Sequence, residues 1–328
     1  MKHFFTLFAL VASSFSAMAS TNHLVINDNV KATANDNDKQ QILNGGFEDW
    51  GLDARNTPKE GETVSTKVSE PRYWHSFSSA YGFFKGFAGN HCFISTDAHS
   101  GNYSACIKAT TTIFDGITAN GTLTTGRLKA GSKDANSPEN HSELDMSKTD
   151  TDRNRDPYYQ VMTSRPDSIV FWVKYSTGKT GTTANMSAYI TDGTYYQAPE
   201  DKTYNNKVGW AENPNIAPCT KWTRISVPFT YADNGLEPKA ILLTFSTSAT
   251  PGGGAGNEIL YVDDVELIYN VKGDVNGDTN VDISDVVELV NIILGSKDGA
   301  ENKKADVNGD TNTDISDVVE LVNIILGK

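Results

Sequence analysis

Twelve acidic and amide residues near the C-terminal end could together hold a hard metal ion in each of two loops. They stand at positions 1, 3, 5, 7, 9 and 12 of two twelve-residue segments. The first set is Asp274, Asn276, Asp278, Asn280, Asp282 and Asp285, and the second is Asp306, Asn308, Asp310, Asn312, Asp314 and Asp317. At position 7 the asparagine would offer its backbone carbonyl. Oxygen-only ligands at this spacing favour Ca²⁺ over zinc or copper, so two calcium sites are predicted.

Both loops belong to one repeated segment. Residues 274–295 and 306–327 lie 32 residues apart and differ only at Val281 and Thr313. After each loop an apolar pattern predicts an amphipathic helix, at residues 284–294 and 316–326, and Gly295 and Gly327 suit left-handed helix caps. Residues 271–328 carry 12 acidic and five basic side chains. Crowded carboxylates repel one another, so we expect cation binding to drive the folding of this tail.

These residues resemble a type I dockerin over 273–328. Aspartate at position 12 and the lack of a helix before the first loop suit that family, whereas Thr279 and Thr311 stand where a full EF-hand has glycine. The resemblance implies a cohesin-like partner on a scaffold or surface protein, bound in either of two orientations about 180° apart. It also implies recognition residues at loop positions 10 and 11 and on the helices: Ile283, Ser284, Asn291, Ile315, Ser316 and Asn323. Isoleucine at position 10 departs from the hydroxyl pair of clostridial dockerins.

The preceding residues, 41–270, read as strands and turns. Runs rich in β-branched and aromatic residues, punctuated by Gly, Pro, Asn and Asp, predict strands. The predicted strands are 103–109, 168–175, 186–191, 222–229, 240–246 and 258–269. Residues 130–156 are nearly devoid of apolar side chains and are predicted to form a long surface loop. Many short strands without helices favour a mainly β, jelly-roll β-sandwich, followed by the small all-α tail.

Several stretches of this module carry a second resemblance. Residues 44–50 and 261–267 are similar to the opening and closing segments of jelly-roll carbohydrate-binding modules. With residues 163–166, 171–175, 237–239, 246–248 and 252–256, they resemble a family known as a proposed carbohydrate metabolism domain, found in exported proteins of anaerobes. The resemblance implies the fold and a polysaccharide-related setting, and it implies no particular reaction.

Asp263 is the one acid in an otherwise apolar alternation along the closing strand. Counting by twos places it with Ile259, Tyr261, Val265 and Leu267. A carboxylate on such a face needs a partner. In one interpretation Asp263 and Glu48 hold a structural Ca²⁺, as in jelly-roll binding modules. In the other, a bulge at residues 263–264 turns the acid outward.

Aromatic side chains could form a platform on which sugar rings stack. The candidates are Trp50, Trp74, Tyr81, Phe83, Phe84, Phe87, Tyr195, Tyr196, Tyr204 and Trp210. The last four stand in a polar stretch and are predicted to be the exposed ones. A glycosidase would need two carboxyl groups at a set separation, which a sequence cannot reveal. No G-x-S-x-G, H-E-x-x-H or complete phosphate-binding motif is present.

The first residues indicate export. A short polar start, the apolar run 4–11 and the sequence Ala17-Met18-Ala19 predict a signal peptide, residues 1–19, followed by a flexible segment, 20–40. No later stretch reaches the ~20 apolar residues of a membrane span. A net charge of −13 disfavours nucleic acid as a partner. The cysteines, Cys92, Cys106 and Cys219, are odd in number; they read as three buried thiols or as a Cys92–Cys106 bridge with one left free.

Three functions fit this pattern. The leading hypothesis is a non-catalytic, carbohydrate-binding β-sandwich tethered through a calcium-dependent dockerin in polysaccharide utilisation. The alternatives are a dockerin-borne glycoside hydrolase or other glycan-active enzyme, and a structural or adhesive surface protein.

Overall fold

The computed structural model describes residues 40–87, 89, 91–111, 116–269, 272–277, 281–295 and 303–327. The predicted signal peptide and nearly all of the predicted flexible segment lie outside these residues, as do Asp278 and Asn280 of the first loop. Among the described residues, no helix is long and apolar enough to cross a membrane.

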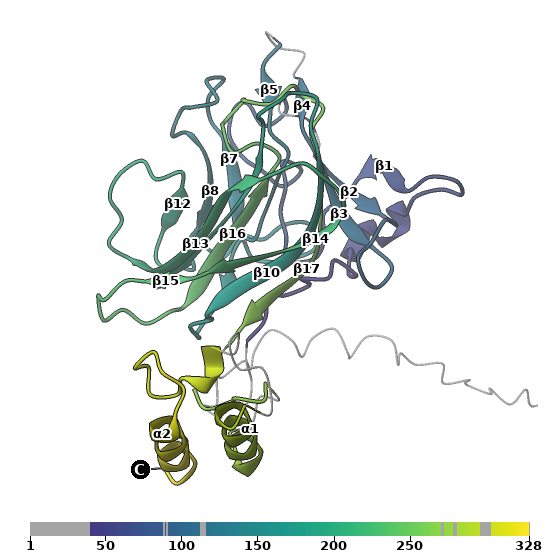
Figure 1. The fold of residues 1–328 in the computed structure, drawn as a ribbon. Coiled ribbons are helices and arrows are strands. Elements are labelled where there is room, and N and C mark those ends of the chain that lie inside the picture. Colours follow the sequence, from purple (N-terminus) through teal and green to yellow (C-terminus); the bar gives the residue numbers. More distant parts are fainter. Residues whose placement is uncertain are drawn as a thin grey trace, which may run out of the picture. The chain divides into compact units, whose positions relative to one another are not determined.

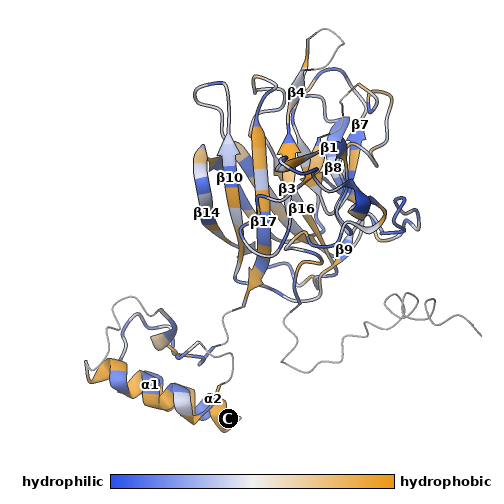
Figure 2. Ribbon diagram, turned by 90° about the vertical axis from the view of Figure 1, so that its right-hand side faces the viewer, coloured by the Kyte–Doolittle hydropathy of each residue, from blue (hydrophilic) through white to orange (hydrophobic). Residues whose placement is uncertain are grey.

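Two antiparallel sheets form the body of residues 41–270 (Figure 1). Sheet A has the order β1 (Val64–Val68), β2 (Cys92–Ser95), β3 (Ser104–Lys108), β17 (Ile259–Ile268), β10 (Ser168–Ser176) and β14 (Cys219–Pro228). Sheet B has the order β15 (Thr230–Tyr231), β13 (Lys207–Ile216), β11 (Ala184–Thr191), β16 (Ala240–Ser246) and β6 (Thr122–Thr124), with β9 (Gln160–Val161) also pairing with β16. Figure 2 shows sheet A from its outer face, with β3, β17, β10 and β14 side by side.

Smaller elements complete the chain. A third sheet, called sheet C, has the order β12 (Tyr196–Ala198), β8 (Asn140–Leu144) and β7 (Arg127–Ala130). The remaining elements are β4 (Thr110–Thr111) paired with β5 (Thr118–Ala119), the 3₁₀-helices η1 (Gly51–Asn56) and η2 (Lys303–Ala305), and the helices α1 (Ile283–Ile293) and α2 (Ile315–Ile325).

The core of the sandwich lies between sheets A and B. Alternate residues of each strand point inward, so β10 contributes Phe171 and β16 contributes Phe245, whose ring centroids lie 5.1 Å apart. Trp74 packs against Phe47 and Phe245 and is fully buried. Because both sheets share this one apolar core, the predicted mainly β sandwich is confirmed.

The C-terminal repeats pack around a core of their own. Leu289 of α1 and Leu321 of α2 are fully buried with Val275, Ala305 and Val307. Each helix begins with a capping box, in which loop position 9 is the N-cap and the aspartate at position 12 bonds back to it. Gly295 and Gly327 have φ of 70° and 65°, as the predicted left-handed caps require. Figure 2 shows hydrophobic and hydrophilic residues along both helices.

All six predicted strands and both predicted helices are present, with ends shifted by no more than a few residues. The predicted surface loop 130–156 is wrong in part, because residues 140–144 form β8. His141, Ser142 and Leu144 of β8 are buried although only one of them is apolar. A Cys92–Cys106 bridge is excluded: Cys92 pairs with Ile107 and Cys106 with Phe93, so the two thiols lie on opposite faces of sheet A.

A bulge changes the alternation of the closing strand. The pairing with β10 shifts between Glu266 and Asp263, and Asp264 has φ of 45°. Val262 and Val265 therefore both enter the core, while Asp263 lies on the outer face, opposite Trp172. The expectation that Asp263 shares a face with Val265 and Leu267 is wrong, since one extra residue reverses the phase of a strand. The alternative, in which a bulge at residues 263–264 turns the acid outward, agrees with the structure, although neighbouring residues bury the Asp263 side chain on that outer face.

A hydrogen-bonded network holds the strands of sheet C together on the face that points away from sheet B. One carboxylate oxygen of Glu143, Oε2, accepts bonds from Tyr81 (2.8 Å), His141 (2.9 Å) and Tyr195 (3.2 Å). The guanidinium of Arg127 lies between the rings of Tyr81 and Tyr158. Burial alone would raise the pKa of Glu143, but the bonds from His141 and Tyr81 outweigh burial and lower it.

We expect Glu143→Gln to destabilise the sandwich, most strongly near neutral pH. A carboxylate whose folded-state pKa is lowered contributes stability above its ordinary pKa of 4.5, and that contribution is lost as the pH falls through the folded-state value. Removing the charge should cost about 1–3 kcal/mol at pH 7 and much less near pH 3. Urea unfolding at both pH values measures this. Glu139→Gln, an exposed neighbour, is the control, and equal losses for both variants would contradict the role of Glu143.

Candidate functional site

The outer face of sheet B carries a strip of polar side chains. In β11 the residues 184, 186, 188 and 190 enter the core, so the alternate residues Asn185, Ser187 and Tyr189 point outward. On the neighbouring strands Ser246 pairs with Asn185, Thr244 pairs with Ser187, and Glu212 pairs with Ser187 from the other side. Paired residues share a face, so these side chains form one continuous surface.

The same face is apolar where sheet C covers it. Ala240 and Leu242 of β16 are buried in a cluster with Leu144 and Tyr196 of sheet C. Thr244 and Ser246, farther along the same face of β16, are half-buried. The composition of the outer face therefore changes from apolar to polar at the edge of sheet C. The polar part is the floor of an open cleft.

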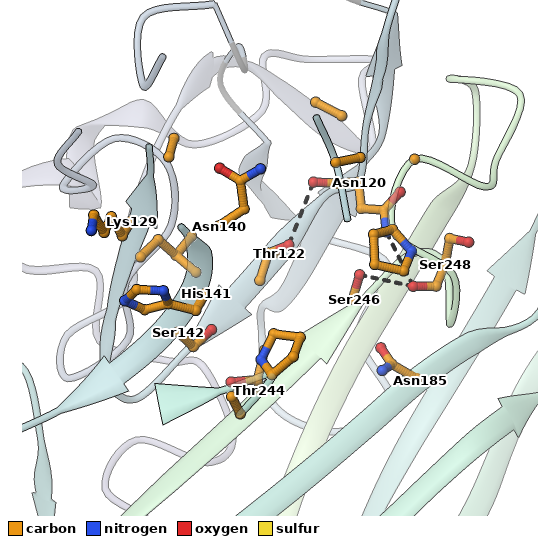
Figure 3. A pocket seen from close by; sticks show the side chains of 18 of the residues that line it. Asn120, Thr122, Lys129, Asn140, His141, Ser142, Asn185, Thr244, Ser246 and Ser248 are labelled. Atoms are coloured by element: carbon orange, nitrogen blue, oxygen red, sulfur yellow. Dashed lines mark hydrogen bonds between the residues drawn. The ribbon is translucent and has the colours of Figure 1, made fainter. Parts of the chain in front are cut away.

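The cleft has a volume of about 490 Å³, within the range of small-molecule sites. Its floor is formed by β11, β16 and β6. Its walls come from sheet C, from the aromatic segment that contains Phe84 and Phe87, and from the segments 117–120 and 248–252. Figure 3 shows Asn120, Thr122, Thr244 and Asn185 around the cavity, with Asn140 and Ser142 on the sheet C side. Among the described residues that line the cleft, Glu212 is the single carboxylate.

The aromatic residues predicted as an exposed sugar platform lie apart from this floor. Tyr196 of β12 is fully buried between sheet C and sheet B, so its predicted exposure is wrong. Tyr195 bonds to Glu143 and Gln197 on the far side of sheet C, and Tyr204 bonds to Asp201. Trp210 lies half-buried on the outer face of sheet B, opposite Tyr189, and does not line the cleft.

The remaining aromatic candidates divide between core and rim. Trp50 and Trp74 are buried in the core. Phe84 and Phe87 line the cleft, and Phe83, with 80% of its surface exposed, packs edge-on against Phe84. The sequence analysis missed Asn185, Ser187, Tyr189 and Thr244. The alternation of polar and apolar residues along 184–191 was the signal that could have found the first three.

Glu48 and Asp263, the predicted pair for a structural calcium ion, hold the same surface segment from two sides. Glu48 Oε1 accepts the backbone N–H groups of Asn102 (2.8 Å) and Tyr103 (2.9 Å). Asp263 Oδ2 accepts the N–H of His99 at 2.7 Å, and Asp263 Oδ1 accepts that of Asp264 at 2.8 Å. Burial raises the pKa of Asp263 to about 7. Backbone amides thus satisfy oxygens that the calcium interpretation assigned to an ion.

The position-12 aspartates of the two repeats connect each loop to its helix. Asp285 accepts the N–H groups of Asn276 (3.0 Å) and Asp282 (2.9 Å), and Asp317 accepts those of Asn308 (3.0 Å) and Asp314 (2.9 Å). Both aspartates are fully buried. A carboxylate has about four lone-pair positions, so two remain on each for a cation. Thr311, at loop position 6, adopts φ of 74°. This β-branched residue therefore takes the left-handed conformation that glycine has at position 6 of an EF-hand.

The donor set of the loops fits calcium. Asp274 Oδ1 is buried without a hydrogen-bond partner, which is costly for a carboxylate unless a cation binds there. Asp274 Oδ2 lies 3.2 Å from Lys304 Nζ. In the second loop Asp306 accepts the N–H groups of Gly309, Asp310 and Thr311. Within the described residues no three His, Cys, Asp or Glu side chains are grouped closely enough to hold a metal ion.

The predicted recognition residues form matching exposed patches on the two repeats. Ile283 and Ile315 are 71% and 69% exposed, and Val287 and Val319, one turn later, are 56% and 57% exposed. Ser284 and Ser316 bond to the N-cap aspartates, and Asn291 and Asn323 are half-buried. Each repeat therefore presents the same apolar stripe to solvent.

Comparison with solved structures finds folds similar to part of the chain. A proposed glycoside hydrolase from Bacteroides thetaiotaomicron is 18% identical with a TM-score of 0.45, covering 66% of this chain and 66% of that one. A proposed glycoside hydrolase from Bacteroides vulgatus is 20% identical with a TM-score of 0.44, covering 64% and 89%. A carbohydrate-binding module in complex with β-1,4-galactotriose is 13% identical with a TM-score of 0.28, covering 70% and 97%. This chain thus spans slightly less than two thirds of the first of these.

No curated protein sequence matches the chain. The family model described as the dockerin type I domain matches residues 272–326. These are the residues of the two loops, the two capped helices and their shared core. Dockerins of this type bind calcium and assemble with cohesin modules, and proteins that carry them are typically extracellular. Residues 272–326 of this chain are a type I dockerin domain.

Proposed function

We propose that this chain is an exported carbohydrate-binding protein, in which the cleft of the sandwich binds a glycan and the dockerin attaches the sandwich to a cohesin-bearing scaffold or surface protein. Residues 1–19 would be the signal peptide, 20–40 a flexible lead-in, 41–270 the binding module and 271–328 the docking module. The observation that carries the proposal is the polar strip on sheet B. It exposes amides and hydroxyls beside aromatic side chains on rigid strands, which is the chemistry that recognises sugar hydroxyls and pyranose faces.

The dockerin would bind two calcium ions, one in each loop. The ligands would be Asp274, Asn276, Asp278, Asn280, Asp282 and Asp285 in the first loop and their counterparts Asp306, Asn308, Asp310, Asn312, Asp314 and Asp317 in the second. The partner would contact Ile283, Ser284 and Asn291, or Ile315, Ser316 and Asn323. Because the two sets are equivalent in sequence and exposure, either could face the partner. The backbone N–H groups that donate hydrogen bonds to Glu48 and Asp263 argue against a third ion in the sandwich.

We expect the mature protein to bind two calcium ions and to lose helix when they are removed. Isothermal titration calorimetry counts the ions, and far-ultraviolet circular dichroism follows helix content during chelation. Asp306→Ala should reduce the count to one, because it removes position 1 of the second loop. Asp233→Ala, an exposed acid of the sandwich, should leave the count at two. A count of three, reduced to two by Glu48→Gln, would instead establish the sandwich site, and binding of no ion would contradict the dockerin sites.

We expect the mature protein to bind oligosaccharides in the cleft and Asn185→Ala to weaken that binding. Loss of one direct hydrogen bond, about 0.5–1.5 kcal/mol, corresponds to a two- to tenfold rise in Kd. A glycan array identifies the ligand, and calorimetry on the hit compares the variants. Asn205→Ala, an exposed amide outside the cleft, is the matched control.

The same experiment separates the alternative functions. Release of reducing sugar from the bound glycan would replace the binding proposal with a glycan-active enzyme. Absence of glycan binding, with cohesin binding intact, would favour a structural or adhesive protein. Equal effects of Asn185→Ala and Asn205→Ala would place the glycan outside the cleft.

A further inference from the structure

Aromatic side chains gather on the outer face of sheet A, on the opposite side of the sandwich from the cleft. In β10, Phe171 and Val173 enter the core, so Trp172 between them points outward. The strand pairing places four residues in one row across the same face: Phe93 of β2, Cys106 of β3, Tyr261 of β17 and Lys174 of β10. Trp222 of β14 continues this row, since its ring centroid lies 6.4 Å from that of Tyr261.

These rings reach solvent. We call five half-buried residues of this face the sheet A platform: Phe93, His99, Trp172, Trp222 and Tyr261. Figure 2 shows β17, β10 and β14 from this side, with no other described strand of the sandwich in front of them. The sheet A platform therefore exposes aromatic surface on neighbouring strands, whose pairing holds the side chains at fixed spacings.

Contacts between these side chains fix the orientation of the rings. His99 stacks on Trp172, with ring centroids 3.7 Å apart and planes inclined by 14°. The ammonium group of Lys174 lies 5.6 Å from the ring centroid of Trp222 and 5.4 Å from that of Tyr261. Trp222 Nε1 has no hydrogen-bond acceptor among the described residues, so ring contacts orient the indole. A side chain that is already fixed loses little conformational entropy when a ligand binds to it.

A charged pair lies in the middle of the sheet A platform. Lys174 Nζ bonds to Asp97 Oδ2, and the two side chains remain 21% and 34% exposed. Charged residues are depleted in the cores of protein–protein interfaces, because burial beneath another protein removes their water. A sugar hydroxyl, in contrast, can accept from an ammonium group and donate to a carboxylate. The position of this pair therefore favours a glycan over a protein surface as the occupant.

Two cations near the ends of the row add hydrogen-bond donors. Arg224 lies across the strands from Trp172 and is exposed, and no hydrogen bond or ion pair joins its guanidinium to any described residue. Lys108 Nζ lies 4.8 Å from the ring centroid of Phe93. Both groups can donate to the hydroxyl and ring oxygens of a sugar. Donors thus stand beside ring faces at both ends of the row.

We propose that the sheet A platform is a second glycan site, separate from the cleft, which binds a stretch of polysaccharide chain. The row from Phe93 to Trp222 crosses five strands and is about 19 Å long at the usual spacing of neighbouring strands, several times the width of one pyranose ring. Ring faces stack on the C–H faces of successive sugars, while Lys174, Asp97 and Arg224 bond to their hydroxyls. The sheet A platform shares no residue with the cleft, so it stands whether or not the cleft binds a glycan.

Affinity electrophoresis of the mature, calcium-loaded protein tests the proposal. The gels contain galactan, xylan, glucomannan or polygalacturonate, so neutral and acidic polysaccharides are separate arms. Trp222→Thr removes a ring from an edge strand and introduces a residue that suits strands. We expect it to raise the Kd for the retained polysaccharide about tenfold or more, since tryptophan is a frequent energetic hot spot of binding surfaces.

Trp210→Thr is the matched control, because Trp210 is also half-buried on the outer face of a sheet but lies on sheet B outside the cleft. It should leave the Kd unchanged. Arg224→Gln removes donors at an exposed position and should weaken retention severalfold. Trp222→Thr should have the same effect in an Asn185→Ala background, because distant sites contribute independently. Thermal unfolding verifies that every variant is folded.

The outcomes separate the sheet A platform from the cleft and from other occupants. A Kd that neither Trp222→Thr nor Arg224→Gln alters would overturn the second glycan site, as would retention that disappears completely with Asn185→Ala. Binding of oligosaccharides without retention by any polysaccharide would overturn the second site and leave the cleft standing, and absence of both would overturn both sites. A dimer in sedimentation velocity that Trp222→Thr dissociates would make a second copy of the chain the occupant instead.

Discussion

The outer face of sheet B must be apolar where protein covers it and polar where water reaches it, and the cleft depends on that constraint. Burial of Leu242 beneath Tyr196 and Leu144 removes apolar surface from water, which is the main driving force for placing sheet C there. Two residues along the same strand, Thr244 is half-buried and lines the cleft. A larger apolar side chain at 244 would extend the covered area and shrink the cavity, so the sequence of β16 helps to set where the cleft begins.

Sheet C, which forms one wall of the cleft, is held together by hydrogen bonds to the carboxylate of Glu143. Glu143 collects three donors on one oxygen, and Arg127 is held between two tyrosine rings. Sheet C is short and has few apolar residues on the side away from sheet B, so burial alone gives it little stability there. Charge-assisted hydrogen bonds are about twice as strong as neutral ones, and they stabilise sheet C on this side in place of apolar burial. The shape of the cavity therefore depends in part on Glu143 and Arg127, which do not line it.

The sequence predicted six of the strands that enter the apolar core but missed others that enter it, among them β2, β6 and β13, and it missed strands held mainly by polar contacts. Residues 240–246 matched β16 because β-branched and apolar residues dominate it. β8, with the sequence NHSEL, looked like a loop because tertiary hydrogen bonds rather than propensity stabilise it. β13 contains a proline and is exposed along part of its length. The bulge at Asp263 could not be placed either, since period-two counting assumes an uninterrupted strand.

The two modules respond to different physical variables. The sandwich has a continuous core drawn from both sheets, so its cleft is organised by apolar packing and by the Glu143 network. The dockerin has a core centred on Leu289 and Leu321, and its loops crowd carboxylates around each turn. Such loops are compact only when a cation offsets their repulsion. Docking should therefore follow the calcium concentration, whereas the packing of the sandwich should not depend on it.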